Sequence, residues 1–281
     1  MPTFETPEPI LATVEVPVGD LRIAARDRAD TVVEVRPSDP SHEPDVHAAQ
    51  QTRVEMTSDG LLVKAPKQRG VSLRSKPGSI DVTIDLPTGS RLRAEAAVAT
   101  LRCTGRLDRC RAKIGAGEID LENAGPVDLT TGAGGIGAGV VSGTAEVTCG
   151  SGRVRLTEID GPAVVRNANG ETWIGAVTGG LQASASNGSI SVDRADGDVT
   201  AKTANGSLRI GRVSRGMATL TTSMGEIEVG IAAGTAALVD AQTRLGNVRN
   251  SLAVTDSPEP ADETAEVHAR TSFGDIVIRR A

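Results

Sequence analysis

Aromatic residues are almost absent from this sequence: its 281 residues include one Trp, two Phe and no Tyr. Apolar residues of all kinds still make up 38% of the chain, so a buried core can be built from Val, Ile, Leu and Ala. Without bulky rings, that core is expected to be thin and regular. The composition favours narrow stacks of short strands over a two-sheet sandwich, which commonly holds aromatic core residues.

An excess of positive charge is also missing, because 36 Asp and Glu residues outweigh 30 Lys and Arg residues and give a net charge of −6. Broad nucleic-acid interfaces need a basic excess, so no nucleic-acid partner is expected. No stretch approaches the ~18 uninterrupted apolar residues of a membrane helix, and the first residues lack the basic segment of a signal peptide. We therefore expect no membrane insertion and a cytoplasmic location.

The sequence contains three cysteines, an odd number: Cys103, Cys110 and Cys149. Their spacing matches neither a disulfide framework nor a CxxC metal motif, so we interpret them as reduced, buried, small apolar residues. A reactive thiol is the alternative for Cys103 and Cys110, because neighbouring arginines at 102, 106, 109 and 111 would lower a thiol pKa.

Glycine is in excess, at 32 residues or about 11% against an average near ~7%. A motif Gly-x-Φ-x-Φ, in which Φ is apolar, recurs at a nearly fixed step. Its lead glycines are Gly117, Gly134, Gly152, Gly170, Gly188, Gly206, Gly225, Gly246 and Gly274. The steps are 17, 18, 18, 18, 18, 19, 21 and 28 residues, so the period is regular over 117–230 and irregular over 231–281. The copy at Gly170 looks shifted by one residue.

Two architectures fit this repeat. Apolar and polar residues alternate within each period, which predicts short strands with one buried face. Asn-Gly pairs at Asn169, Asn187 and Asn205 favour antiparallel hairpins. A fixed step of about 18 residues with three apolar clusters instead favours a parallel β-solenoid, or β-helix, in which like residues stack in ladders. We favour the solenoid, with three short faces per coil, because a fixed step has no role in a hairpin meander.

Residues 1–95 lack the short period but still indicate β-structure. Strands are predicted at 12–18, 20–25, 31–35, 53–57, 61–64, 79–86 and 91–96, with long loops at 36–50 and 65–78. Because the first coil of a solenoid exposes a sheet edge, we interpret 1–95 as a non-repetitive, β-rich N-terminal cap continuous with the solenoid of 96–281. At the other end, Arg279 and Arg280 are expected on the last strand, where their charge would discourage end-to-end stacking.

Three features resemble the bacterial DUF4097 family. They are the run TVEVPVGDLRI at 13–23, the turn IDLPTGS at 84–90 and the Gly-x-Ile-x-Leu coils. The family is described as adhesin-like proteins with repeated β-strands, and the resemblance covers nearly the whole chain. It implies an all-β, solenoid-like fold. The family carries no established catalytic residues, so the resemblance implies none here.

Candidate metal-binding residues are few. His42, Glu43, Asp45 and His47 contain the side chains of a zinc site. A metal site needs a rigid geometry, whereas the prolines at 37, 40 and 44 predict a mobile surface loop. His268 lies in an alternating run and is expected on the wet face of a strand.

Other motifs give no sign of an enzyme. There is no Gly-x-Ser-x-Gly elbow, and the glycines within 132–135 precede no predicted helix, so they predict turns rather than a phosphate loop. The sequence Asp196-Gly197-Asp198 occurs once, which argues against calcium-binding repeats. The acids Glu118, Glu226 and Asp275 occupy equivalent positions that elsewhere hold Gly, Arg or Ser, which predicts a solvated face. We therefore predict no catalytic, cofactor-binding or metal-binding residues.

Two functions follow as hypotheses. The first is a non-catalytic structural or interaction protein, of scaffold or adhesin-like type, presenting a repetitive surface to a protein partner or to itself. The second is a carbohydrate- or small-ligand-binding β-helix, including a carbohydrate-active one, in which several acids or Trp173 converge on one groove. The basic residues Lys64, Lys67, Arg69, Arg74 and Lys76 would serve either solubility or an acidic partner.

Overall fold

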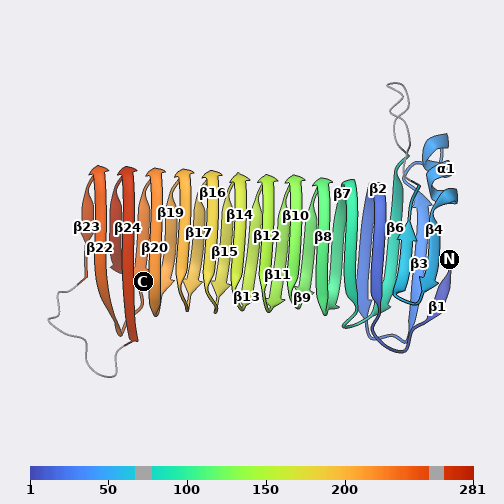
Figure 1. The fold of residues 1–281 in the computed structure, drawn as a ribbon, viewed down its shortest axis with the longest axis horizontal. Helices are drawn as coiled ribbons and strands as arrows, with labels where there is room; N and C mark the ends of the chain where they lie inside the picture. Colours follow the sequence, from blue (N-terminus) through green and yellow to red (C-terminus); the bar gives the residue numbers. More distant parts are fainter. Residues whose placement is uncertain (67–77, 253–262) are drawn as a thin grey trace. The chain divides into compact units, whose positions relative to one another are not determined.

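The computed structural model describes residues 1–66, 78–252 and 263–281. Its contacts divide the chain into two units, Met1–Gly139 and Val140–Ala281. Both units consist of short β-strands (Figure 1), and the described residues contain one α-helix, α1 (Glu43–Gln51). The predicted all-β parallel solenoid is confirmed.

Each regular coil of the second unit contains two strands, which join two different parallel ladders. In one coil, β17 (Ile190–Ala195) is followed by β18 (Val199–Asn205). β17 pairs in parallel with β19 (Leu208–Val213), and β18 with β16 (Leu181–Asn187), so that each residue lies beside the residue 18 positions away. The hairpin alternative is therefore wrong, because the Asn-Gly pairs connect strands that are not paired with each other.

In chain order, the remaining strands of the second unit are β12 (Ala145–Ser151), β13 (Val154–Asp160), β14 (Ala163–Asn169), β15 (Thr172–Val177), β20 (Gly216–Met224), β21 (Ile227–Ile231), β22 (Thr235–Leu245), β23 (Val248–Asn250), β24 (Glu263–Phe273) and β25 (Ile276–Arg280).

Three strand faces per coil were expected, but the coil has two strands. The third apolar cluster is the end of the first strand: Ala195 is buried and belongs to β17, after two consecutive exposed residues, Asp193 and Arg194. These two residues break the alternation by one position, so one strand contributes two separate apolar clusters to the core.

The coil corner explains the lead glycines. Gly188 has a φ of +146°, and a Cβ atom there would overlap the carbonyl oxygen of Gly170 in the preceding coil. The carbonyl groups of these corner glycines also accept hydrogen bonds from buried threonines. Thr203 donates its hydroxyl to the Gly188 carbonyl at 3.1 Å, and Thr222 to the Gly206 carbonyl at 2.9 Å. Close stacking and positive φ together require glycine at this corner.

The copy at Gly170 is not shifted, contrary to expectation. Thr172 lies in register between Val154 and Ile190 and is buried, so it takes the first core position. Asn167, also buried, donates its amide to the Thr172 hydroxyl at 3.3 Å. A polar pair inside the coil therefore replaces an apolar residue, and Trp173 points outward.

The final coils do not stack in chain order. β24 lies between β20 and β22, and β25 lies between β21 and β23. Arg279 consequently lies on an inner strand, where it pairs with Glu228 at 2.8 Å. The expectation that Arg279 and Arg280 mark the last strand is wrong, because β22 and β23 are the outermost strands of this unit (Figure 1).

The first unit is organised around one long strand, β2 (Leu11–Arg26), where two strands were predicted. It pairs in parallel with β7 (Arg91–Leu107) from Leu11 to Ala25, so the predicted break is only a bend. The other strands are β1 (Thr3–Glu5), β3 (Asp30–Pro37), β4 (Arg53–Thr57), β5 (Gly60–Lys64), β6 (Ile80–Pro87), β8 (Arg109–Ala116), β9 (Ile119–Ala124) and β10 (Val127–Ala133), while β11 (Ile136–Ser142) leads into the second unit.

The outer edge of the first unit is covered. β5 and β6 pair in parallel with β2, and on their other side they pair antiparallel with β4 and β3, respectively. β1 pairs antiparallel with β3, and α1 contacts β3 and β6. The loop predicted at 36–50 is wrong, because residues 43–51 form α1. Its Pro44 lies in the first helical turn, where proline is tolerated.

Candidate interaction surfaces

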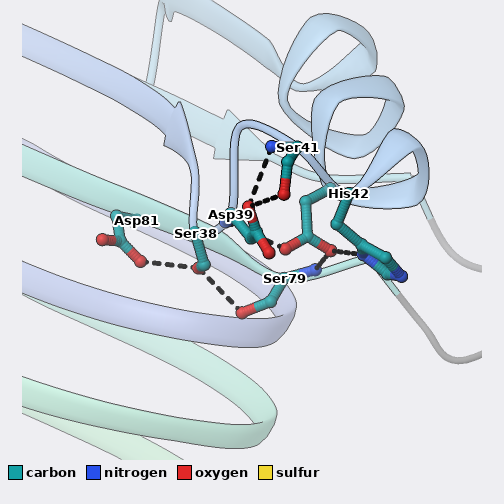
Figure 2. Close-up of polar contacts among 7 residues, drawn as sticks. Ser38, Asp39, Ser41, His42, Ser79 and Asp81 are labelled. Carbon is teal, nitrogen blue, oxygen red and sulfur yellow. Dashed lines mark hydrogen bonds and ion pairs between the residues drawn. The ribbon is translucent and has the colours of Figure 1, made fainter.

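A polar cluster anchors α1 to the sheet (Figure 2). The carboxyl of Asp45 is buried and accepts hydrogen bonds from the Ser79 backbone N–H at 2.9 Å and the Asp39 backbone N–H at 3.1 Å, with His42 Nδ1 at 2.7 Å. Burial raises the pKa of Asp45, but these hydrogen bonds outweigh it and hold the pKa below its usual range. Asp39 in turn accepts the backbone N–H and the hydroxyl of Ser41.

The cluster positions the helix and does not assemble the four predicted metal ligands. Only His42 and Asp45 contact each other, while Glu43 and His47 are exposed. Within residues 1–66, 78–252 and 263–281, no three His, Cys, Asp or Glu side chains are placed to hold a metal ion. The prediction of a mobile loop at these residues is wrong, because hydrogen bonds to Asp45 fix both α1 and the start of β6.

The three cysteines are buried. Burial raises the pKa of the Cys103 thiol well above its usual value, and the adjacent Cys110 thiol raises it further. Burial likewise raises the pKa of Cys149. A reactive cysteine needs a lowered pKa, so the nearby arginines do not activate Cys103. All three side chains are buried thiols, which confirms the interpretation as small core residues.

Trp173 and the acids do not converge on one groove. Trp173 is half-buried on β15, with the Arg155 guanidinium 4.4 Å from its ring centroid. Glu226 and Asp275 immediately precede the paired strands β21 and β25, which are separated from β15 by β17 and β19. The Asp275 carboxylate accepts a hydrogen bond from the Asn247 backbone N–H at 2.9 Å. Glu118 belongs to the first unit.

The remaining candidate side chains already have protein partners. His268 is half-buried, with Nε2 2.8 Å from Glu266 and Nδ1 3.6 Å from Asp240. In the Asp196-Gly197-Asp198 turn, Asp196 accepts the Ser214 hydroxyl at 2.8 Å, and Asp198 accepts the Met217 backbone N–H at 2.9 Å. Lys64 pairs with Glu15 at 2.6 Å, whereas Lys67, Arg69, Arg74 and Lys76 lie outside the described residues.

Sequence reasoning missed an apolar groove in the first unit. It has a volume of about 570 Å³, and its lining includes apolar residues such as Val16, Pro17, Ala96 and Ile114 together with the charged residues Glu15, Glu95 and Lys113. Small residues follow one another along it at the coil step, at positions 97, 115 and 132. Small residues at equal steps were the signal that would have located this groove.

A ladder of asparagines follows the corner of the regular coils. Asn187 donates its side-chain amide to Asn169 at 2.9 Å, and Asn205 donates to Asn187 at 2.9 Å. The predicted stacking of like residues is thus confirmed. In the last coils the ladder gives way to apolar residues, which are exposed: Met224 at 53%, Phe273 at 55% and Leu245 at 66%.

The outward face of β14, β16, β18, β20 and β24 carries a second column. Arg166, Ser184, Lys202, Thr221 and Arg270 lie side by side in register, and all are exposed. Basic side chains therefore alternate with hydroxyls along this "basic column", roughly two strand spacings or ~10 Å apart.

Comparison with known proteins finds no matching family model and no matching curated protein. Among solved structures, the chain is similar to a putative adhesin from Parabacteroides merdae, at 11% identity with a TM-score of 0.43, covering 99% of this chain and 94% of that one. It is also similar to putative adhesins from Parabacteroides distasonis (13% identity, TM-score 0.36) and Bacteroides fragilis (12%, 0.34), each covering 100% of this chain and 95% of the other. These structural similarities identify no ligand or partner for this chain.

Among the described residues, no helix has the length and apolar character needed to cross a membrane.

Proposed function

We propose that this chain is a non-catalytic interaction protein of scaffold or adhesin-like type, whose repetitive outer face binds a protein partner. The basic column is the observation that carries this proposal. Exposed side chains at fixed strand spacing form a surface that a partner with regularly spaced acidic groups would match. Lys202 is the central cation of the column, while Arg166 and Arg270 also contact Glu146 at 3.4 Å and Asp240 at 3.5 Å. The resemblance of 13–23 and 84–90 to the adhesin-like DUF4097 family supports the same role.

Charge reversal in the column tests the proposal. We expect affinity capture from the native cell, followed by mass spectrometry, to identify a partner that Lys202→Glu no longer retains. Arg212→Glu is the matched control, because Arg212 is equally exposed but lies on β19, in the other ladder. Partners retained equally by both variants, or a measured turnover of some substrate, would contradict the proposal.

The groove of the first unit favours small-ligand binding as a second candidate function. Its apolar lining would take an apolar ligand, because burial of such a surface is favourable. A fluorescent apolar probe, anilinonaphthalene sulfonate, should bind the native chain. Ala97→Leu, which fills the groove, should weaken that binding, whereas Ala176→Leu on the outward face of β15 should not. Equal probe binding by all three proteins would remove this candidate.

A further inference from the structure

Within the described part of the chain, the series of backbone hydrogen bonds at the coil corner ends at the outermost coil. The N–H groups of Gly206, Gly225 and Gly274 donate to the carbonyls of Met224, Phe273 and Leu245, each in the next coil of the stack. The next donors in the two ladders are Gly246 and Val248. Neither has a backbone acceptor within the described ranges. Among the described residues, no strand lies beyond β22 and β23, so this outermost coil has no strand partner along its outer edge there.

The side chains of this edge are those of an inner strand. The inward positions of β22 hold Ala237, Val239, Ala241 and Thr243, and the equivalent positions of β24 hold Ala265, Val267, Ala269 and Thr271. The two sets are identical in residue type. In β24, which has a strand on both sides, all four are buried, whereas in β22 all four are only half-buried. β22 thus has a core sequence suited to a further coil.

Exposed apolar residues concentrate at the same place. Of the ten exposed large apolar side chains in the described residues, six lie on β20 and β22–β24. They are Met217, Met224, Leu238, Leu245, Val248 and Phe273. Met224, Phe273 and Leu245 are neighbours in register at one corner, and contiguous exposed apolar surface of this kind marks an interaction site.

We propose that this edge binds the same edge of a second copy of the chain, forming a closed, two-fold symmetric dimer. This inference rests on the proposed interaction function and names one partner. A second copy fits better than a single added peptide strand because both β22 and β23 lack an outer strand partner among the described residues. Another copy offers two matching edges and a matching open core.

The charges of β22 are complementary to themselves in an antiparallel register. When two copies of β22 pair about Gln242, Asp240 of one copy faces Arg244 of the other, and this contact occurs twice. Arg244 is exposed, with no ion pair among the described residues, and Asp240 already lies 3.5 Å from Arg270. Such a reciprocal contact is typical of an isologous interface.

The pairing closes on itself because the edge of the first unit is already covered by β3, β4 and α1. Head-to-tail addition of further copies would need that edge to be open. A dimer rather than a filament is therefore expected.

Light scattering coupled to size exclusion tests this inference on the full chain. The expected mass is twice the 28.8 kDa of one chain. Arg244→Glu places like charges opposite each other twice and should raise the dissociation constant at least about tenfold. Val239→Lys, an inward lysine on an edge strand, should give a monomer with a nearly unchanged melting temperature. Arg212→Glu is the matched control and should remain dimeric.

Three outcomes would overturn the dimer. They are a monomeric native chain at high micromolar concentration, a dimer unaffected by both Arg244→Glu and Val239→Lys, or loss of the dimer when residues 253–262 are replaced by a Gly-Ser linker of equal length. The proposed function is distinguishable from the dimer, because a monomer that still captures its partner through Lys202 refutes only the dimer. Conversely, a dimer whose capture is insensitive to Lys202→Glu refutes only the basic column.

Discussion

In the first unit, β3 and β4 run antiparallel to β6 and β5, and α1 packs over β3 and β6. In the second unit, β22 and β23 follow the same parallel register as every coil before them, and their outer edge has no partner among the described residues. Reversing strand direction ends a parallel stack, because no further coil can continue the register. A last coil that keeps the parallel direction can instead pair with a further strand in the same register.

The two edges also differ in the residues that hold them. The covered edge depends on single, non-repeated contacts around Asp45 and Gly78, whereas the open edge repeats residues already present in the preceding strand. Substitutions should therefore act strongly at the first edge and weakly at the second.

Gly78→Ala should have the largest effect on stability, because the added methyl group would push α1 away from β6. A Cβ at this position would overlap the Pro44 carbonyl oxygen and lie 2.9 Å from the Ala48 Cβ. We expect a loss of about 3 kcal/mol in unfolding free energy, measured by urea denaturation, since the helix must move. The uncovered edge of the first unit should then self-associate.

Gly180→Ala is the control for this substitution. The nearest atom to its added Cβ is the Asp198 carbonyl oxygen at 3.9 Å, an ordinary contact, so stability should change by less than about 1 kcal/mol. Equal effects of the two substitutions would show that α1 does not need Gly78.

Asp45→Ala should have the next largest effect. It leaves the N–H groups of Ser79 and Asp39 without their acceptor in a partly buried site, which costs about 2 kcal/mol. Amide hydrogen exchange should report faster exchange in α1 and at the start of β6, with no change in the coils of the second unit. Uniformly faster exchange in both units would contradict a local role.

Lowering the pH should reproduce part of that loss. The folded-state pKa of Asp45 is below its ordinary value of 3.8, so ionisation stabilises the fold above that value. The stabilisation disappears as the pH falls through the lower, folded-state pKa. The difference in melting temperature between the native chain and Asp45→Asn should therefore be constant near neutral pH and shrink below about pH 4. A difference that persists at pH 2 would exclude the carboxylate as its source.

The regular coils were predictable because the step of 18 residues fixes which residues stack. The Asn ladder, the buried positions such as Ile190 and Val192, and the parallel register all follow from that step. Helix α1 was not predictable in the same way. Its nine residues follow two prolines and include a third, so the local pattern favours a loop until Asp45 is seen to bind Ser79.

The order of the last coils could not be predicted either. The inward residues of β22 and β24 are identical in type, so either strand would pack equally well on β20. Chain order favours β22 there, yet the structure places β24. The outward charges do not predict the order of β22 and β24 either. The contact between Asp240 and Arg270 would form whichever of these two strands lies outermost. The open edge, and with it the proposed dimer, was therefore visible only in the structure.

Asn187→Ala should have the smallest effect on stability. Paired with a substitution in the last coils, it compares the asparagine ladder with the apolar residues that replace it at the same corner. Asn187 donates to Asn169 and accepts from Asn205, but both bonds are exposed, so a loss of about 1 kcal/mol is expected. Leu245→Ala changes the equivalent position on the outermost strand, where the side chain is exposed, and should leave thermal stability nearly unchanged while weakening dimerisation. If Leu245→Ala destabilises the folded chain more than Asn187→Ala does, the apolar residues of the last coils stabilise the coil itself rather than an interface.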